Sequence, residues 1–406
     1  MLKNFNLNQF IKTSVTGREE SLLKPDLEQY AGELGTQIDG KSVLVIGGAG
    51  TIGSSYIRAL LQYCPKRLYV VDINENGLTE LVRDLRSTTG LNIPNDFKAY
   101  PIDFGSAVFE RLLTTEGPFE IVANFAAHKH VRSEKDSYSI AAMIDNNVIK
   151  AHRLLNLLSA TPVEHFFCVS TDKAANPVNI MGASKKLMEE VILAYASRIP
   201  VTTARFANVA FSNGSLPLGF LERFARQQAW ACPTDVKRFF VSPEESGQLC
   251  LIASVLGKSG DIFYPKLDMV NDMKPFSDIA CKLLAAWGWQ VDACASEEEA
   301  RQKAAQLNDA STAYPVYFFS SDTSGEKPYE EFYTENEALD TQTFAKLGVI
   351  KNAPKRTPEE LDAIIKDINT LFTHGDVEKA QIVSLLVRYL PNFEHIETGK
   401  NLDQKM

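Results

Sequence analysis

The chain has 406 residues, of which 45% are hydrophobic and 23% charged, a composition typical of globular proteins and not of disordered or membrane-spanning ones. Its formal net charge of −9 argues against general binding to nucleic acid or to anionic lipid. No apolar run reaches the ~18 residues of a membrane helix, and the start lacks a signal-peptide pattern. The six cysteines are scattered along the chain. We therefore expect a cytoplasmic protein with reduced thiols.

The order of predicted elements indicates an α/β fold. Residues 1–40 are polar and weakly periodic, as expected of an N-terminal arm, and from there short β-rich runs alternate with stretches of helical length. This alternation predicts a doubly wound parallel sheet of the Rossmann type over residues 41–210, to which residues 240–265 return. We expect residues 211–339 to form mainly a smaller substrate-binding lobe and residues 340–406 a C-terminal helical extension. The strand-like runs are SVLVIGG, RLYVVD, FKAYPID, EIVANFAA, HFFCVS and VTTARFA.

The strongest local motif is VIGGAGTIG, in which Gly47, Gly50 and Gly53 follow a buried strand and open a helix. Glycines here permit a tight turn and let a pyrophosphate approach backbone N–H groups at the helix N-terminus. Asp72 ends the next strand, where a carboxylate accepts hydrogen bonds from ribose hydroxyls. Because that carboxylate would repel a 2′-phosphate, the motif favours NAD over NADP. With Gly48 inserted, the spacing is the short-chain dehydrogenase variant of the fingerprint.

The segment ANFAAHKHV follows a later predicted strand, and its small residues leave room for the nicotinamide half of a dinucleotide. His128 and His130 have the spacing of a metal-binding pair. No third ligand is suitably spaced, and Lys129 places a cation between the two histidines, so we expect no metal site. Asn147, further along, either braces a kink in a helix or is a polar surface residue.

Polar residues cluster most densely in VSTDKAANPVNIMGASKKLMEE. This run places Ser170, Thr171, Asp172 and Lys173 at the carboxyl end of a predicted strand, where doubly wound folds keep their sites. An acid beside a base-capable amine, with a hydroxyl next to them, suits proton transfer on a sugar. An ordinary surface Asp-Lys pair in a loop would produce the same pattern, so this fragment alone leaves both interpretations open.

Two capping patterns predict helices in the second half of the chain. Ser296 and Glu299 are spaced as a capping box at the start of a helix over residues 296–307. The run Thr357-Pro358-x-Glu360 combines an N-cap, a proline at the first helical position and a reciprocal cap. Apolar residues then recur at helical spacing until Gly375, which we expect to end that helix, and a second helix is expected to begin near Asp376.

The runs STDKAANP…MGASK, GGAGTIG, AAHKHV, RFANVAFSNGS and FYPK together resemble the nucleotide-sugar 4,6-dehydratases of the extended short-chain dehydrogenase/reductase superfamily, in the expected order over roughly residues 41–335. The chain is most similar to the UDP-N-acetylglucosamine 4,6-dehydratases that begin legionaminic acid or bacillosamine synthesis. This resemblance implies a lyase with NAD as cofactor and a UDP-sugar as substrate. We also expect a homo-oligomer, since the arm and the helical tail offer assembly surfaces.

The resemblance also implies roles for individual residues. Lys173 removes the proton from carbon 5, Asp172 protonates the departing 6-hydroxyl, and Thr171 hydrogen-bonds the 4-hydroxyl. Lys185, the fourth residue of the catalytic set, holds the nicotinamide ribose. The implied cofactor-binding residues are Gly47, Gly50, Thr51, Ile52, Gly53, Asp72, Asp103, Phe104, Ala126, Ala127, Ser170 and Lys185. The implied substrate-binding residues are Lys129, Asn208, Ser212, Ser215, Arg238 and Lys266. For Arg238 and Lys266, solvated surface charges are the alternative.

The sequence departs from the superfamily pattern at two places. Most members carry Tyr-x-x-x-Lys, but the position four before Lys185 is Met181, and a thioether cannot transfer a proton. Lys173 or a water is then the candidate acceptor of the 4-hydroxyl proton, and relatives with this methionine are generally associated with retention of configuration at carbon 5. Phe211 and Asn213 replace a glycine and an arginine of the commoner pattern NVxGSRGS.

Two other functions compete with the dehydratase. A UDP-sugar 4-epimerase would share the fold and the cofactor, but the missing tyrosine argues against it. A non-catalytic nucleotide-binding sensor would have no use for the intact Thr-Asp-Lys set.

Overall fold

The computed structural model describes residues 5–321, 329, 331–373 and 377–397. A nine-stranded sheet forms the larger lobe, with the order β14-β15-β10-β6-β5-β4-β1-β2-β3. All six strands expected from the sequence are present and parallel, which confirms the doubly wound α/β fold. The parallel strands are β1 (Ser42–Ile46), β2 (Arg67–Asp72), β3 (Asp96–Pro101), β4 (Ile121–Asn124), β5 (His165–Val169), β6 (Val201–Ala204) and β10 (Ile262–Pro265).

Two antiparallel strands complete the sheet beyond β10. They are β15 (Leu347–Ile350), which pairs with β10, and β14 (Leu339–Asp340), which pairs with β15. These strands overlap the start of residues 340–406, for which the sequence predicts a helical extension. The structure differs because the run LGVI is apolar and only four residues long, which suits a fully buried strand and not a helix.

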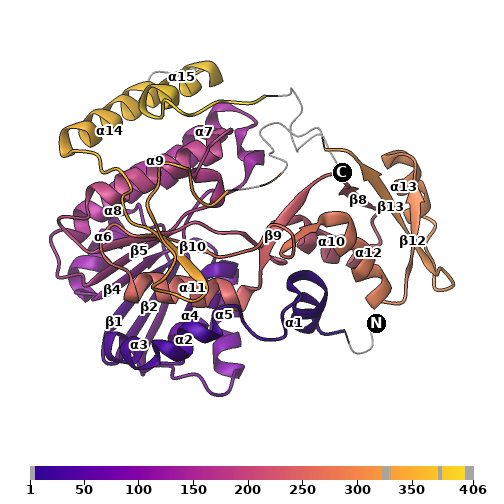
Figure 1. Cartoon of the computed structure of the whole chain (residues 1–406), viewed down its shortest axis with the longest axis horizontal. Helices are drawn as coiled ribbons and strands as arrows, with labels where there is room; N and C mark the ends of the chain where they lie inside the picture. The colour runs from indigo at the N-terminus through magenta and orange to yellow at the C-terminus, as the bar shows by residue number, and fades with distance from the viewer. Residues whose placement is uncertain (1–4, 322–328, 330, 374–376, 398–406) are drawn as a thin grey trace.

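Helices cover both faces of this sheet, as Figure 1 shows. The helices packed on one face are α3 (Ala31–Ile38), α4 (Thr51–Leu60), α5 (Glu75–Ser87) and α11 (Pro243–Leu256). Those on the opposite face are α6 (Ala107–Glu116), α7 (Ser137–Ile144), α8 (Lys150–Leu158) and α9 (Ile180–Ala194). Both faces of the inner parallel strands are therefore buried, which explains why their sequences are almost continuously apolar, whereas the edge strand β3 is partly exposed.

The C-terminal helices α14 (Pro358–Thr373) and α15 (Lys379–Tyr389) pack on the second of these faces, over α9. The predicted reciprocal cap is confirmed, because Glu360 N donates to Thr357 Oγ1 at 3.2 Å and Thr357 N donates to a Glu360 carboxylate oxygen at 2.9 Å. The expected helix end at Gly375 and the start near Asp376 lie outside the described residues.

At α13 (Glu297–Ala304), Ser296 caps Glu299 N as predicted, but Glu299 accepts from Ala295 N instead of Ser296 N.

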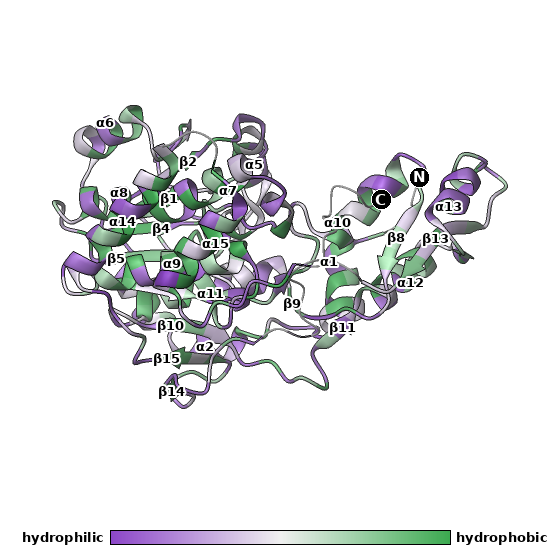
Figure 2. Cartoon of the chain, turned by 90° about the horizontal axis from the view of Figure 1, so that it is seen from above, coloured by the Kyte–Doolittle hydropathy of each residue, from purple (hydrophilic) through white to green (hydrophobic). Residues whose placement is uncertain are grey.

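A smaller lobe lies beside the carboxyl side of the sheet, and Figure 2 shows its elements set apart from the larger lobe. Its aromatic core includes Phe220, Trp230 and Tyr314. One small sheet has the order β12-β13-β8, and a second, β11-β9-β7, lies where the lobes meet. The elements are β7 (Asn208–Val209), α10 (Leu216–Ala225), β8 (Trp230–Pro233), β9 (Lys237–Val241), β11 (Met273–Pro275), α12 (Phe276–Ala286), β12 (Gln290–Cys294) and β13 (Ala313–Phe319).

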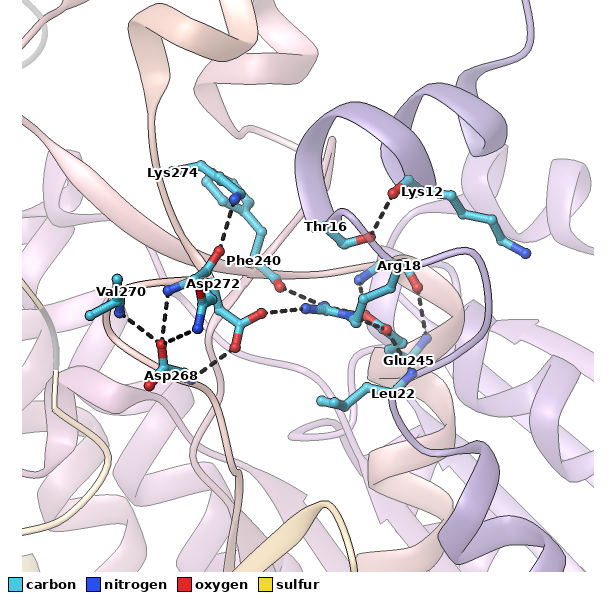
Figure 3. Close-up of polar contacts among 12 residues, drawn as sticks. Lys12, Thr16, Arg18, Leu22, Phe240, Glu245, Asp268, Val270, Asp272 and Lys274 are labelled. Carbon is cyan, nitrogen blue, oxygen red and sulfur yellow. Dashed lines mark hydrogen bonds and ion pairs between the residues drawn. The ribbon is translucent and has the colours of Figure 1, made fainter.

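The N-terminal arm connects the two lobes. Its short first helix α1 (Leu7–Phe10) and the following turn pack into the core of the smaller lobe, whereas α2 (Lys24–Gln29) and α3 lie on the larger lobe. Between them, Arg18 forms two hydrogen bonds with the Glu245 carboxylate, at 2.8 and 2.9 Å. Arg18 also donates to Asp272 Oδ1 at 3.0 Å and to Phe240 O at 2.9 Å (Figure 3). One arginine thus links the arm to α11, β9 and the loop before β11.

Candidate functional site

A cleft of about 480 Å³ opens where several parallel strands end at their carboxyl side. Much of its lining comes from segments at the carboxyl ends of the strands, as expected for a doubly wound sheet, and residues of α7, α8, α9 and the turn between α7 and α8 complete it. The segments are residues 47–53 after β1, 72–73 after β2, 102–104 after β3, 125–129 after β4, 170–173 after β5 and 206–209 after β6. The cleft is therefore built by the order of the strands and not by any single loop.

The glycine-rich turn forms the floor of this cleft. Gly47 has a φ of +75°, and a Cβ on it would lie 2.5 Å from Ala126 N, so only glycine fits there. A Cβ on Gly53 would meet Gly47 O at 2.3 Å. Gly50 occupies the N-cap of α4, and no described side chain caps that end, so N–H groups at Thr51 and Ile52 remain available to an anion.

Two carboxylates stand at the ends of neighbouring strands. Asp72 is held by backbone donors on both oxygens, from Ala49 N at 3.0 Å and Asn74 N at 2.9 Å. Asp103 accepts from Lys150 Nζ at 2.7 Å. Burial alone would raise the pKa of Asp103, but Lys150 outweighs it and lowers that pKa. Both side chains line the cleft as fixed hydrogen-bond acceptors.

Thr171, Asp172 and Lys173 lie together at the tip of β5 and line the cleft. Asp172 Oδ1 accepts from Thr171 Oγ1 at 2.8 Å, from Lys173 N at 2.9 Å and from Lys173 Nζ at 3.2 Å. Asp172 is buried, with a relative exposure of 4%. The alternative of a surface Asp-Lys pair in a loop is therefore wrong, because the pair is inside the cleft.

Lys185 lies behind the strand tip, on α9. Its Nζ donates to Val169 O at 2.7 Å, and burial lowers the pKa of its amine. Met181, where most of the superfamily has tyrosine, is also buried and lines the cleft. Met181 N donates to Glu134 Oε1 at 2.8 Å. The helix turn that would carry the missing tyrosine is thus fixed in place and directed at the cleft.

Two buried polar atoms in the cleft lack a hydrogen-bond partner among the described residues. These atoms are Asn208 Nδ2 and Ser170 Oγ. Ser170 Oγ approaches the Glu189 carboxylate without reaching hydrogen-bond geometry. A buried polar group without a partner costs free energy, roughly 1–3 kcal/mol, so such groups in a cleft indicate contacts that a ligand completes. With the uncapped α4 and the fixed Asp72, these atoms fit a dinucleotide and a polar substrate.

Every expected cofactor-binding residue and all four expected catalytic residues line this one cleft. Of the expected substrate-binding residues, Lys129, Asn208 and Ser212 line it as well. Ser215 instead caps α10, where its Oγ accepts from Leu218 N at 3.3 Å.

Arg238 and Lys266 are not part of the cleft, and neither is a solvated surface charge. Arg238 is buried and donates to Lys237 O at 2.8 Å. Lys266 Nζ donates to Thr341 O at 2.5 Å and to Phe344 O at 2.6 Å, which ties β10 to the loop between β14 and β15. The sequence could not show this, because the carbonyl groups that hold Lys266 come from residues 75 and 78 positions further along the chain.

Asn147 is a buried bracing residue, and the surface alternative for it is wrong. It lies in a short π-helical turn (Asp145–Ile149) between α7 and α8, with 1% of its surface exposed. Its Oδ1 accepts from His128 N and its Nδ2 donates to His128 O, both at 2.9 Å. Its Nδ2 also donates to Ser184 Oγ at 3.1 Å. The wide turn is what brings an amide side chain on this helix to the loop after β4.

A buried ion cluster behind the strand tip was not anticipated from the sequence. Arg205 donates to both oxygens of Glu189 at 3.0 Å and to both oxygens of Glu337 at 2.9 Å. Burial alone would raise the pKa of Glu189, but Arg205 outweighs it and lowers that pKa. The only signal in the sequence is an arginine inside the strand run VTTARFA, where a buried charge demands a partner.

Phe211 has a φ of +54°, in the left-handed region that favours glycine. The commoner family pattern has a glycine at this position, the residue type that this backbone conformation favours. The Phe211 ring is buried against Phe10 of the arm, with ring centroids 6.0 Å apart. Packing of the arm therefore holds an otherwise unfavourable turn in place.

The family model described as "Polysaccharide biosynthesis protein" matches residues 43–352. The probable polysaccharide biosynthesis protein EpsC of Bacillus subtilis is 28% identical over 326 residues, 79% of this chain and 49% of that protein. The chain thus spans about half the length of this relative. A Campylobacter jejuni UDP-N-acetylglucosamine 4,6-dehydratase (inverting) is 28% identical over 240 residues, 56% of this chain and 68% of that one. A UDP-glucose 4-epimerase of Rickettsia typhi is 28% identical over 233 residues, 56% of this chain and 66% of the epimerase.

Solved structures show the same fold. The X-ray structure of Pen from Bacillus thuringiensis matches 88% of this chain and 99% of its own, with a TM-score of 0.62 and 21% identity. DesIV, a dTDP-glucose 4,6-dehydratase from Streptomyces venezuelae with NAD and DAU bound, matches 80% of this chain and 95% of its own, with a TM-score of 0.55 and 16% identity. Likenesses this distant establish the Rossmann-type fold alone. Over the described part of the chain, no helix is both long enough and apolar enough to cross a membrane.

Proposed function

Since this chain belongs to the polysaccharide biosynthesis protein family, we propose that it is a nucleotide-sugar 4,6-dehydratase. Its substrate would be UDP-N-acetylglucosamine, and its product the 4-keto-6-deoxy sugar nucleotide formed by loss of one water. The proposal is carried by one observation, the Thr171-Asp172-Lys173 cluster that shares a cleft with the glycine-rich turn of α4. The name of the Campylobacter jejuni relative supports the substrate class.

A nicotinamide dinucleotide, when bound, supplies a reversible hydride acceptor. We propose that the N–H groups of Thr51 and Ile52 hold its pyrophosphate and that Asp72 accepts hydrogen bonds from its ribose hydroxyls. Ser170 Oγ, buried and unpartnered among the described residues, is available to the same ligand. Asp72 favours NAD, because its carboxylate would repel the extra phosphate of NADP. The DesIV structure was solved with NAD bound, which agrees with this choice.

The Asp172–Lys173 pair supplies the acid and the base. Three donors converge on Asp172 Oδ1, an arrangement that favours a carboxylate beside an ammonium. Elimination needs the opposite state, a neutral Lys173 to remove the carbon 5 proton and a protonated Asp172 to release the 6-hydroxyl as water. Moving one proton from Nζ to the carboxylate converts the first state into the second without any proton from solvent. Burial of Asp172 lowers the cost of this shift, since it penalises the charged pair.

Retention of configuration at carbon 5, and a place at the start of a legionaminic acid or bacillosamine route, are finer proposals. They rest on Met181 at the tyrosine position. The Campylobacter jejuni relative is named as inverting, so configuration is a direct test of how far this chain departs from it. A homo-oligomer in the cytoplasm also stays a prediction.

The dehydratase is tested by mass spectrometry and NMR of the product made from UDP-N-acetylglucosamine with NAD. We expect the loss of one water, and the NMR spectrum reports the configuration at carbon 5. Asp172→Asn should keep cofactor and substrate affinity but abolish water loss, because an amide cannot protonate the leaving hydroxyl. Unaltered turnover in Asp172→Asn would place the acid elsewhere.

A UDP-sugar 4-epimerase is the second candidate, favoured by the epimerase among the relatives. It would yield an isomer of unchanged mass, so the same assay separates the two functions.

A further inference from the structure

We propose that Lys129 takes the role of the missing tyrosine and accepts the proton of the substrate's 4-hydroxyl. This inference rests on the proposed dehydratase function and deepens it, because that function leaves the first proton acceptor unassigned. Four lysines line the cleft, namely Lys129, Lys150, Lys173 and Lys185. The structure distinguishes Lys129 from the other three.

Lys129 and the catalytic cluster follow neighbouring strands of the sheet and line the same cleft. β4 and β5 are neighbours in the sheet, and Asn124 at the end of β4 pairs with Cys168 of β5. Lys129 follows Asn124 at the same spacing as Lys173 follows Cys168, and both side chains line the cleft. The two lysines therefore belong to segments that follow paired residues of adjacent strands and line one cleft.

A chain of hydrogen bonds fixes the Lys129 loop to the helix turn where the tyrosine is missing. Asn147 holds both the N–H and the C=O of His128, the residue before Lys129. The same Asn147 side chain donates to Ser184 Oγ, and Ser184 donates to Met181 O at 2.8 Å. The backbone beside Lys129 is thus coupled to the backbone of Met181, where the tyrosine is missing, by these side-chain contacts.

The other three lysines are already engaged. Lys185 donates to Val169 O and is buried, Lys173 pairs with Asp172, and Lys150 pairs with Asp103. Lys173, once its proton has moved to Asp172, is needed to remove the carbon 5 proton, so it cannot also keep the 4-hydroxyl proton. The Lys150 amine is held by both oxygens of the Asp103 carboxylate. Lys185 is turned to the main chain of β5.

Lys129 has the environment of a base. No carboxylate of the described residues lies within ion-pair distance of it, and its side chain is exposed within the cleft, where a substrate can reach it. Although the side chain is exposed to the cleft, neighbouring protein atoms partly desolvate the amine, and this desolvation lowers its pKa. A lowered pKa gives Lys129 a larger neutral fraction near pH 7 than a solvated lysine has.

Atoms and electrons balance in this step. The Nζ lone pair of Lys129 forms an N–H bond with the 4-hydroxyl proton while the O–H bond breaks. The electron pair of that bond forms the carbonyl at carbon 4, and the hydrogen on carbon 4 leaves with its own electron pair to the oxidised nicotinamide acceptor. After turnover Lys129 returns its proton to solvent, so the net loss from the sugar is one water.

The first test needs neither cofactor nor substrate. Trace labelling of the free protein with acetic anhydride at several pH values, read by mass spectrometry, reports the neutral fraction of each lysine. We expect labelling of Lys129 to begin at lower pH than labelling of Lys282, which is exposed on α12 in the smaller lobe. The same pH dependence for both lysines would overturn the proposal.

The second test separates two half-reactions in Lys129→Met, with Lys282→Met as the matched control. Lys129→Met should bind UDP-N-acetylglucosamine in calorimetry and lose at least 100-fold in dehydration. It should still exchange the carbon 5 hydrogen of the authentic 4-keto product for deuterium, because that step uses Lys173. Methylamine should restore part of the dehydration in Lys129→Ala, which a purely structural role would not allow.

The results distinguish the two levels of inference. If the wild type dehydrates the substrate and Lys129→Met does so at a similar rate, Lys129 is not the acceptor and the dehydratase stands. If Lys129→Met loses both dehydration and deuterium exchange, its role is structural and the proposal is wrong. If the wild type fails to dehydrate UDP-N-acetylglucosamine, the proposed function fails, and the assignment of Lys129 fails with it.

Discussion

Replacing Arg18 by methionine should strongly lower the free energy of unfolding. Arg18 belongs to the N-terminal arm and does not line the cleft. The change removes four hydrogen bonds, two to Glu245, one to Asp272 and one to Phe240 O (Figure 3). It leaves the Glu245 carboxylate, only 2% exposed, without its counter-charge. Methionine keeps most of the apolar stem, so loss of packing is small.

The magnitude follows from the burial of the pair. Removing one partner of a buried ion pair typically costs about 3–5 kcal/mol, because the other charge stays desolvated. Arg18 is 16% exposed, and Glu245 keeps two backbone donors, Leu22 N and Ser242 N. Both facts place the loss at the lower end, about 3 kcal/mol.

Urea unfolding followed by tryptophan fluorescence measures this loss. All three tryptophans, Trp230, Trp287 and Trp289, lie in the smaller lobe, onto which the first part of the arm packs. The signal therefore reports the lobe that Arg18 attaches to the rest of the molecule. Arg83→Met is the matched control, because its pair with Glu80 is exposed and such pairs contribute little.

The double variant Arg18→Met/Glu245→Gln provides the decisive comparison. Glutamine can still cap Ser242 N, and it leaves no buried charge, so we expect it to regain most of the lost stability. If Arg18→Met unfolds at the same urea concentration as the wild type, Arg18 does not stabilise the protein by compensating the buried charge of Glu245. A double variant as unstable as Arg18→Met would likewise refute the electrostatic reasoning.

Three further predictions concern the cleft and its surroundings. Asn147→Ala should lower kcat and reduce stability by about 1–3 kcal/mol, because it leaves His128 N–H and C=O without their partner; wild-type turnover would show that the loop does not need this brace. Lys266→Met should lower the melting temperature without lowering the affinity for UDP-N-acetylglucosamine in calorimetry, since the Lys266 amine donates to Thr341 O and Phe344 O. A tenfold weaker substrate affinity would show that Lys266 contacts the substrate after all. In fluorescence titrations, Asp72→Ala should lower the affinity for NAD by about 10-fold or more, as expected for loss of hydrogen bonds to a charged acceptor. The affinity for NADP should fall less. Equal losses for both cofactors would mean that Asp72 does not contact the ribose.

Much of the larger lobe could be predicted because its signals are local. Each parallel strand is a short apolar run, and the glycine-rich turn and the Thr171-Asp172-Lys173 cluster directly follow such runs. In a doubly wound sheet the carboxyl ends of the strands meet at one edge, so knowing where the strands end is enough to bring these residues into one cleft. Lys129, in the segment that follows β4, obeys the same rule.

The tertiary structure alone decided which charges are buried and what they contact. Lys266 has the residue type of a phosphate site, but the fold directs its amine to the backbone carbonyl groups of Thr341 and Phe344. Asn147 could have been on the surface until a π-helical turn brought its amide to His128. These outcomes depend on pairs that are far apart along the chain, and a buried polar group is satisfied by whichever donor or acceptor the packing brings near it. Sequence periodicity records only which face of an element is buried, not which distant residue lies opposite.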